Sequence, residues 1–175
     1  MQSSTSYFAY GSNLYPNRLE QRVGSCRIVG VARLSAFRLS FHKRGKDGSA
    51  KCDAYKTGDD RHSVYGVVYV LSDNQLAILN DIEGLGAGYE LETSQVQIIQ
   101  SAQLINAHLY VTQNAYIDVS LAPYSWYLDF VLYGARIQGL PSAYISQLEK
   151  TKVISDPNKQ RQSSNQKILS GGLSS

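Results

Sequence analysis

The sequence has few of the residues that build disulfide-rich, collagen-like or disordered proteins. Its 175 residues include two cysteines, Cys26 and Cys52, too few for a disulfide scaffold or a zinc site made of cysteines. Four prolines and 14 glycines exclude a collagen or a Pro-rich linker protein. Charged residues make up only 18%, whereas hydrophobic residues make up 43%, enough for one core of ordinary domain size.

Long apolar runs and phosphate-binding motifs are also missing. No stretch has 18 consecutive apolar residues, so we expect no membrane span. The N-terminus has no basic region followed by an apolar run, so we expect no signal peptide and a cytoplasmic location. Neither GxGxxG nor a Gly-Lys-Ser/Thr loop occurs, so nucleotide phosphate is not indicated. The net charge of +3 does not demand a nucleic-acid partner.

The hydrophobic patterns that are present predict one α+β domain. The expected strands are residues 7–10, 29–32, 37–41, 64–71, 89–99 and 105–112. The expected helices are residues 16–22, one opened by a capping box of Ser72 and Gln75, and two that begin at Pro123 and Pro141. Residues 43–60 are expected to be irregular. Because the strands mostly follow one another, we expect a largely antiparallel sheet or small barrel with helices outside. The domain spans residues 1–154, and residues 155–175 form a polar, flexible C-terminal tail.

A glycine-containing turn, Tyr10-Gly11-Ser12-Asn13-Leu14, lies between the first expected strand and the first helix. A turn at a helix start presents unpaired backbone N–H groups, and these groups together with the helix dipole favour an anion such as a carboxylate. Alternatively, Ser12 or Asn13 only caps the helix, which is the commoner role for such residues and the one that the turn alone favours.

Two carboxylates, Asp81 and Glu83, end a helix just before three glycines, Gly84, Gly86 and Gly88. A buried carboxylate at a helix C-terminus is destabilised in its charged form, which suits a general base. The alternative is a helix C-cap with both carboxylates in solvent. The two interpretations stand about level on these residues alone.

Other reactive residues give weak signals. His42, His62 and His108 are too scattered in sequence to suggest a metal site, and we expect neither a metal nor an organic cofactor. The basic stretch at residues 43–56 is interrupted by Asp47 and Asp53, so we interpret it as a solvated loop rather than a nucleic-acid patch.

The motif YFAYGSNL at residues 7–14 resembles the signature of the γ-glutamylcyclotransferase-like proteins. Later blocks resemble that family in the same order, at residues 31–34, 64–69, 81–84, 88–89, 133–135 and 139–141 and at Tyr144. The resemblance covers roughly residues 7–150. It implies a small, mostly antiparallel β-barrel flanked by helices. It also implies cyclisation of a γ-glutamyl amide or peptide to 5-oxoproline with release of an amine or amino acid, with no metal or cofactor.

The resemblance also assigns roles to residues. Glu83 stands at the catalytic glutamate position and acts as general acid and base. Tyr10, Gly11, Ser12, Asn13 and Leu14 form the binding turn, and Tyr89 and Tyr110 pack over or hydrogen-bond the γ-glutamyl unit. Asp81 is expected to be structural. The spacing from Glu83 to Tyr89 is about one residue shorter than in some animal members, so the Tyr89 hydroxyl is expected to be presented differently.

The expected partner is a small γ-glutamyl molecule, with no nucleic acid and no membrane, and the protein is expected to be a monomer or a homodimer. An alternative is a non-catalytic module that binds a small carboxylate on the same fold. A third hypothesis, a nucleic-acid-binding protein that uses residues 43–56, predicts binding that falls steeply with salt. The sequence does not choose the amine side of the substrate.

Overall fold

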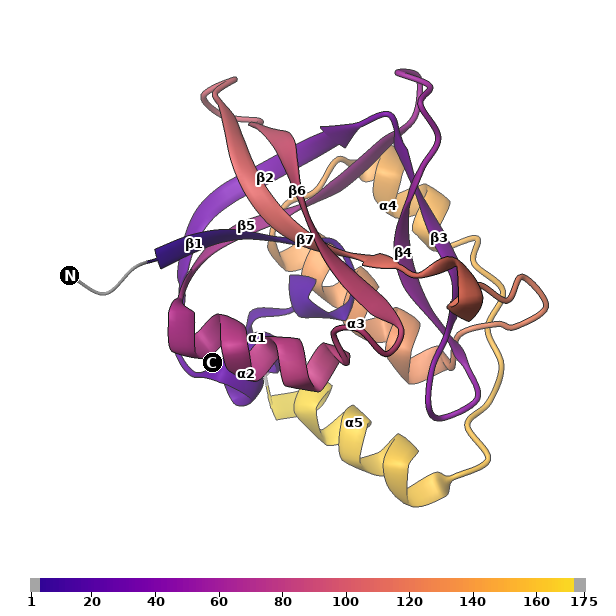
Figure 1. The fold of residues 1–175 in the computed structure, drawn as a ribbon. Helices are drawn as coiled ribbons and strands as arrows, with labels where there is room; N and C mark the ends of the chain where they lie inside the picture. The colour runs from indigo at the N-terminus through magenta and orange to yellow at the C-terminus, as the bar shows by residue number, and fades with distance from the viewer. Residues whose placement is uncertain (1–3, 172–175) are drawn as a thin grey trace.

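The computed structural model describes residues 4–171 and has a closed five-stranded barrel at its centre (Figure 1). The barrel strands, in chain order, are β1 (Ser4–Ala9), β2 (Arg27–Ser35), β5 (Ser63–Ser72), β6 (Tyr89–Ile98) and β7 (Leu104–Thr112). Their order around the barrel is β1-β5-β2-β6-β7, and only β1 and β7 pair in parallel. The predicted α+β class with a small, mostly antiparallel barrel is confirmed.

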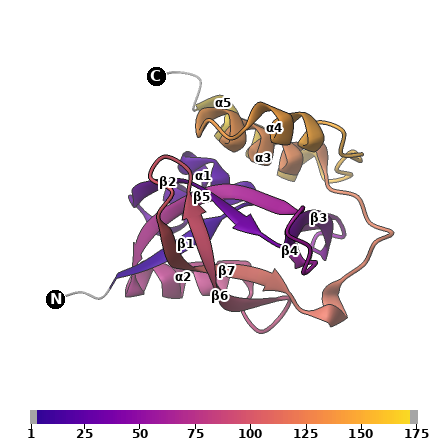
Figure 2. The same cartoon turned by 90° about the horizontal axis from the view of Figure 1, so that it is seen from above.

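A hairpin and the helices surround this barrel. The hairpin consists of β3 (Phe37–Arg44) and β4 (Ala50–Lys56). The helices are α1 (Pro16–Val23), α2 (Asp73–Glu83), α3 (Ser125–Ile137), α4 (Ser142–Leu148) and α5 (Lys159–Gly171), with short 3-10 helices η1 (Ser12–Leu14) and η2 (Asn114–Tyr116). Figure 2 shows α3, α4 and α5 together on one side of the barrel. Within residues 4–171, no helix is long and apolar enough to cross a membrane.

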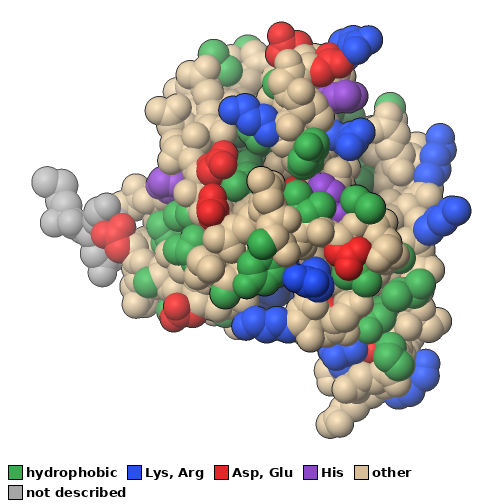
Figure 3. Space-filling model, turned by 45° about the vertical axis from the view of Figure 1, so that its right-hand side comes forward, with side chains coloured by type: hydrophobic (Ala, Val, Ile, Leu, Met, Phe, Trp, Pro, Cys, Tyr) green, Lys and Arg blue, Asp and Glu red, His purple; other side chains and the backbone are tan. Residues whose placement is uncertain are grey.

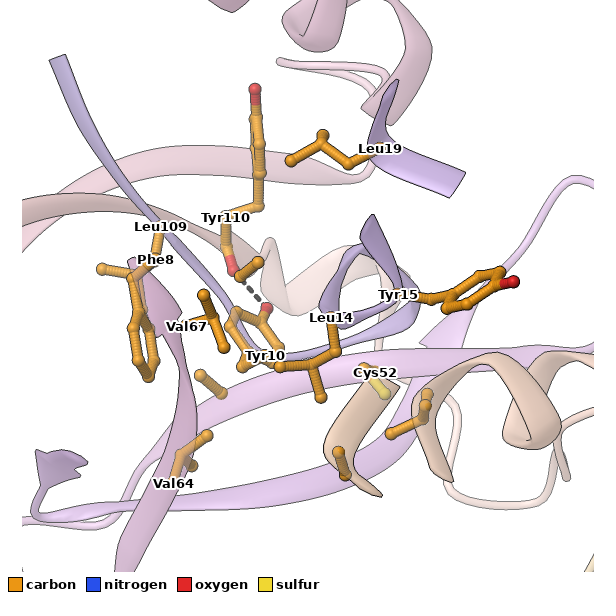
Figure 4. Close-up of a cluster of buried hydrophobic side chains, with 14 of the residues drawn as sticks. Phe8, Tyr10, Leu14, Tyr15, Leu19, Cys52, Val64, Val67, Leu109 and Tyr110 are labelled. Carbon is orange, nitrogen blue, oxygen red and sulfur yellow. Dashed lines mark hydrogen bonds between the residues drawn. The ribbon is translucent and has the colours of Figure 1, made fainter. Parts of the chain in front are cut away.

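The core of the barrel follows from the β-branched run in β5. Val64 and Val67 have no exposed surface and lie with Phe8 in the cluster shown in Figure 4. β-Branched side chains suit a pleated, buried surface. Gly66 leaves room for the neighbouring strand, because a Cβ there would lie 2.4 Å from the carbonyl oxygen of Ala9. β1 and β5 can therefore approach closely only with glycine at this position.

The start of α2 confirms the predicted capping box. The backbone N–H of Gln75 donates to Ser72 Oγ at 3.2 Å, and the backbone N–H of Ser72 donates to Gln75 Oε1 at 3.0 Å. Two N–H groups that the helix itself leaves unpaired are thereby satisfied.

The prediction of an irregular connection over residues 43–60 was wrong, because β4 lies within it. In β4 the small residues Ala50, Cys52 and Ala54 share one buried face, while on the other face Lys51 is partly exposed and Asp53 is buried. Charges and small apolar residues hid this pattern, since strand prediction relies on large β-branched and aromatic residues.

The segment predicted as a flexible tail contains a packed helix, α5, whose Leu169 is 9% exposed. A buried carboxylate, Asp156, anchors the approach to α5. It accepts hydrogen bonds from Trp126 Nε1 at 2.9 Å, from the backbone N–H of Asn158 at 2.8 Å and from the guanidinium of Arg161 at 2.6 and 2.7 Å. Composition suggested a tail because these anchors are tertiary contacts of polar residues. Residues 172–175 of the predicted tail lie outside the described residues.

Replacement of Asp156 by Ala should lower the free energy of unfolding by about 2 kcal/mol, because it leaves the buried Trp126 N–H and Arg161 without an acceptor. The measurement is thermal denaturation followed by the fluorescence of Trp126, the only tryptophan in the chain. The control is Glu149→Ala, which removes a half-exposed ion pair with Arg136 and should cost less than about 0.5 kcal/mol. Equal losses in the free energy of unfolding for the two variants would contradict the anchoring role of Asp156.

The same anchor predicts a pH dependence. Hydrogen bonds from Arg161, and then those from Trp126 and Asn158, hold the pKa of Asp156 well below its usual range. A carboxyl whose folded-state pKa is depressed stabilises the fold above its unfolded-state value of about 4. The contribution is lost as the pH falls below that value toward the folded-state pKa. The Asp156→Ala variant should therefore show a smaller loss of stability between pH 5 and acid than the wild-type protein does.

Candidate active site

The topology brings the glycine turn and the end of α2 to the same end of the barrel. β1 runs antiparallel to β5, with Ser4 beside Ser72 and Ala9 beside Val67. α2 starts directly after Ser72, and its 11 residues rise about 16 Å, close to the roughly 17–20 Å length of the six-residue β1. The helix and the strand therefore finish together, which places Glu83 beside the turn that follows Ala9.

A small pocket lies where these two ends meet. It is narrow, with an internal volume of about 30 Å³, and it adjoins a larger cavity of about 220 Å³. Its lining consists of Tyr7, Tyr10, Gly11, Ser12, Asn13, Cys52, Glu83, Tyr89, Tyr110 and Tyr127. Half of these residues are tyrosines, and the sequence has 13 tyrosines against four phenylalanines. Of the predicted site residues, all but Leu14 line this pocket.

Glu83 is held by two donors from the N-terminal part of the chain. Its Oε1 accepts a hydrogen bond from Asn13 Nδ2 at 3.0 Å and forms an ion pair with Arg22 Nη1 at 2.7 Å. Arg22 also donates to Asn13 Oδ1 at 2.9 Å, so the three side chains orient one another. The positive charge of Arg22 offsets the unfavourable position of a carboxylate at a helix C-terminus. The side chain of Glu83 is 19% exposed and remains accessible from the pocket.

The turn supplies backbone donors and a close approach. Leu14 and Tyr15 donate within η1 to the carbonyls of Gly11 and Ser12, whereas no acceptor within residues 4–171 takes the N–H groups of Ser12 and Asn13. A Cβ on Gly11 would lie 3.1 Å from Cys52 Cβ, so glycine lets β4 approach the turn. Leu14 is fully buried away from the pocket and contributes to the core that fixes the turn.

The tyrosine hydroxyls are mostly engaged by the protein. Tyr89 donates to the carbonyl of Cys52 at 2.5 Å, Tyr110 donates to Asn80 Oδ1 at 2.7 Å, and Tyr10 donates to the carbonyl of Tyr110 (Figure 4). Burial raises the pKa of Tyr10 and Tyr89 well above 10, so both stay neutral at physiological pH. The hydroxyl protons of Tyr10 and Tyr89 are therefore already donated to the backbone. Glu83 is the one carboxylate among the lining residues.

Several residues of this site were missed by the sequence analysis. Tyr7 accepts from Asn13 Nδ2 at 3.0 Å, and Tyr127 accepts from the backbone N–H of Cys52 at 3.0 Å. Arg22 lies nine residues after Asn13 on a polar helix, where nothing local indicates a partner. The other carboxylate, Asp81, is exposed and does not line the pocket.

Cys52 lines the pocket without being a reactive thiol. The residue is 2% exposed, and burial raises the pKa of its thiol to about 12, so the nucleophilic thiolate is scarce at neutral pH. Cys26 is only partly buried, so a reagent can reach it, although burial also raises the pKa of its thiol to about 11. A thiol reagent in excess should therefore label Cys26 slowly in the native protein at pH 7.5 and should reach Cys52 only after denaturation. Mass spectrometry of the labelled peptides checks this, and rapid native labelling of Cys52 would contradict its burial.

The remaining sequence candidates do not assemble into a second site. His42 bonds to Asp53, His62 to Thr57 and His108 to Thr93, each in a different place. Across residues 4–171 no three His, Cys, Asp or Glu side chains are grouped as metal ligands. On the face in Figure 3, Lys and Arg side chains are dispersed among other residues rather than forming one continuous basic surface.

Comparisons with family models, with individual proteins and with solved structures each find similarity to this chain. A family model described as the AIG2-like family matches residues 63–148. A human protein named γ-glutamylcyclotransferase is 32% identical over 163 residues, which cover 90% of this chain and 81% of that protein. A bovine protein of the same name is 31% identical over 148 residues, which cover 81% of this chain and 76% of that protein. A solved structure titled γ-glutamyl cyclotransferase has a TM-score of 0.79 and 27% identity, covering 87% of this chain and 90% of its own.

Proposed function

Because the chain belongs to the γ-glutamylcyclotransferase family, we propose that it converts a γ-glutamyl amide or peptide into 5-oxoproline and a free amine or amino acid. The observation that carries this proposal is the single carboxylate of the pocket, Glu83, held by Asn13 and Arg22 next to the free N–H groups of the turn. The other lining side chains are neutral at physiological pH.

The first step requires a base. At neutral pH the α-amine of a γ-glutamyl compound is an ammonium ion, which has no lone pair for attack. Glu83 takes one proton from this ammonium, and the freed amine then attacks the γ-carbonyl of the same molecule. A nitrogen–carbon bond forms, and the carbonyl oxygen becomes an oxyanion.

The second step returns the proton. The oxyanion collapses to the lactam carbonyl, and the bond from the γ-carbon to the leaving nitrogen breaks. An amide nitrogen leaves poorly unless it is protonated, so Glu83 gives its proton to this nitrogen. The lactam nitrogen still carries a second proton of the original ammonium; it loses this proton, and the departing amine ends as an ammonium ion. The products are therefore 5-oxoproline and a protonated amine, no water is consumed, and Glu83 is again a carboxylate.

Binding serves to fold the flexible γ-glutamyl chain on itself. In this proposal the N–H groups of Ser12 and Asn13, which have no acceptor within residues 4–171, bind the α-carboxylate, and the ring of Tyr89 is an apolar wall of the pocket. Holding the amine close to the carbonyl is worth several kcal/mol as a proximity effect. Removal of water by the buried tyrosines strengthens the hydrogen bonds within the pocket.

The experiment that tests the proposal is incubation of the purified protein with γ-glutamyl amino acids and γ-glutamyl amines. We expect 5-oxoproline and the free amine in equal amounts by mass spectrometry. Thermal stabilisation by these compounds without product would instead favour a module that binds a small carboxylate. Neither product nor stabilisation would reject both functions.

A further inference from the structure

The larger cavity of about 220 Å³ beside the pocket is unusually basic. It shares Ser12, Glu83, Tyr89 and Tyr127 with the pocket, so the two spaces adjoin along one wall. We call this cavity the vestibule. Its charged lining residues are Arg18, Arg22, Lys43, Lys46 and Lys51 on the basic side and Asp47 and Glu83 on the acidic side.

The ion pairs of the vestibule leave positive charge unmatched. Arg22 pairs with Glu83 at 2.7 Å, and Lys51 pairs with Asp47 at 2.7 Å. No carboxylate within residues 4–171 forms a salt bridge with Arg18, Lys43 or Lys46. Arg18 has neutral partners, Asn165 Oδ1 at 3.1 Å and the ring of Phe130, whose centre lies 4.1 Å from Arg18 Cζ, and burial lowers the pKa of its guanidinium to about 10.

Lys43 is the most unusual of these cations because it is 7% exposed. A bulge between Phe41 and Lys43 shifts the register of the hairpin and redirects the side chains beyond it. The ammonium of Lys43 lies 4.6 Å from the centre of the Tyr89 ring and forms no hydrogen bond within the described chain. Gly88 leaves room for it, since a Cβ there would lie 2.9 Å from Lys43 Cε.

A buried ammonium without a carboxylate partner is costly unless a ligand brings the counter-charge. Burial lowers the pKa of Lys43, although the nearby charge of Glu83 opposes this. The γ-glutamyl unit itself carries one ammonium and one carboxylate, so it adds no net charge. Any counter-charge for the vestibule must therefore come from the amine half of the substrate.

We propose that the vestibule holds the leaving amine and that Lys43, with Arg18 and Lys46, selects amines that bear two carboxylates. This inference rests on the proposed cyclotransferase function and names its substrate class, a γ-glutamyl conjugate of an acidic amino acid or short acidic peptide. Lys43 acts as a specificity-determining residue and takes no part in the proton transfers. The surplus of positive charge disfavours conjugates whose leaving half is cationic.

The test compares kcat/KM for γ-glutamyl-glutamate, γ-glutamyl-alanine and γ-glutamyl-butylamine, whose leaving halves carry two, one and no carboxylates. The wild-type protein should prefer the first over the last by roughly 10- to 100-fold, the range for a hydrogen bond to a charged group. Added salt should reduce this ratio. In the Lys43→Gln variant most of this preference for γ-glutamyl-glutamate should be lost, and in Lys43→Arg part of it should return because the positive charge is restored.

Two further variants keep the test decisive if Lys43→Gln folds poorly. Lys46→Gln replaces an exposed vestibule cation and should lower the ratio about two- to threefold. Lys56→Gln changes an exposed lysine at the opposite end of the same hairpin and should leave the ratio unchanged. A wild-type ratio near one, or a ratio that neither vestibule variant lowers, would overturn this inference alone. No 5-oxoproline from any of the three compounds would overturn the proposed function, and this inference with it.

Discussion

Replacement of Glu83 by Gln should lower kcat for 5-oxoproline formation about 100- to 10,000-fold. Glutamine keeps the shape of the side chain and an oxygen that can accept from Asn13 or Arg22, but it cannot take a proton from the α-ammonium. No second carboxylate lines the pocket to replace it. The measurement is the rate of 5-oxoproline release at saturating substrate.

Two controls separate loss of chemistry from loss of structure. Asp81→Asn removes an exposed carboxylate that lies two residues away and outside the pocket lining, and its kcat should stay within about twofold of wild type. The Glu83→Gln variant should still be stabilised thermally by γ-glutamyl compounds, because the turn and the tyrosines remain. A Glu83→Gln variant with wild-type kcat would remove Glu83 from the mechanism.

Replacement of Gly134 by Ala should lower the free energy of unfolding by roughly 3 kcal/mol. Gly134 lies in α3 where this helix crosses the turn, and a Cβ there would lie 2.4 Å from the carbonyl carbon of Leu14 and 2.5 Å from the nitrogen of Tyr15. These neighbours are backbone atoms, so the turn and the helix must move apart. Because the same turn carries Ser12 and Asn13, kcat/KM should fall as well. Urea denaturation and the 5-oxoproline assay measure the two effects.

Gly171→Ala is a matched control for this prediction. Gly171 is the last residue of α5, and no atom of residues 4–171 lies within 4 Å of a Cβ placed there. Alanine is intrinsically favoured over glycine in a helix by up to about 1 kcal/mol, so this variant should be neutral or slightly more stable. If both variants had the same stability, close packing of α3 on the turn would not explain the glycine at position 134.

Much of the fold and the centre of the site could be predicted because their signals are local. The β-branched run of β5 and the capping box at Ser72 report the nearby chain directly. The turn at residues 10–14 and Glu83 each suggested chemistry on their own, with structural alternatives that stood at least level. The resemblance to one family predicted that the turn and Glu83 belong to the same site. They meet because β1 runs antiparallel to β5, so that α2, which follows β5, ends beside the turn that follows β1.

The parts that could not be predicted depend on contacts between distant segments. Arg22 becomes a site residue only because α1 and α2 pack side by side, and its local sequence is that of an ordinary polar helix. Tyr127 reaches the pocket from α3 through the backbone of Cys52, in a strand that its charged residues concealed. The anchoring of α5 likewise depends on Asp156, whose partners lie in α3 and in α5 itself.

The most direct test of cyclisation by Glu83 is to run the reaction in water labelled with oxygen-18 and to measure the mass of the glutamyl product by mass spectrometry. Intramolecular attack by the α-amine retains the original γ-carbonyl oxygen, so we expect unlabelled 5-oxoproline from the wild-type protein and little product from Glu83→Gln. Hydrolysis would instead give glutamate with one labelled oxygen. Labelled glutamate as the first product, or equal 5-oxoproline from both proteins, would contradict cyclisation with Glu83 as the acid and base.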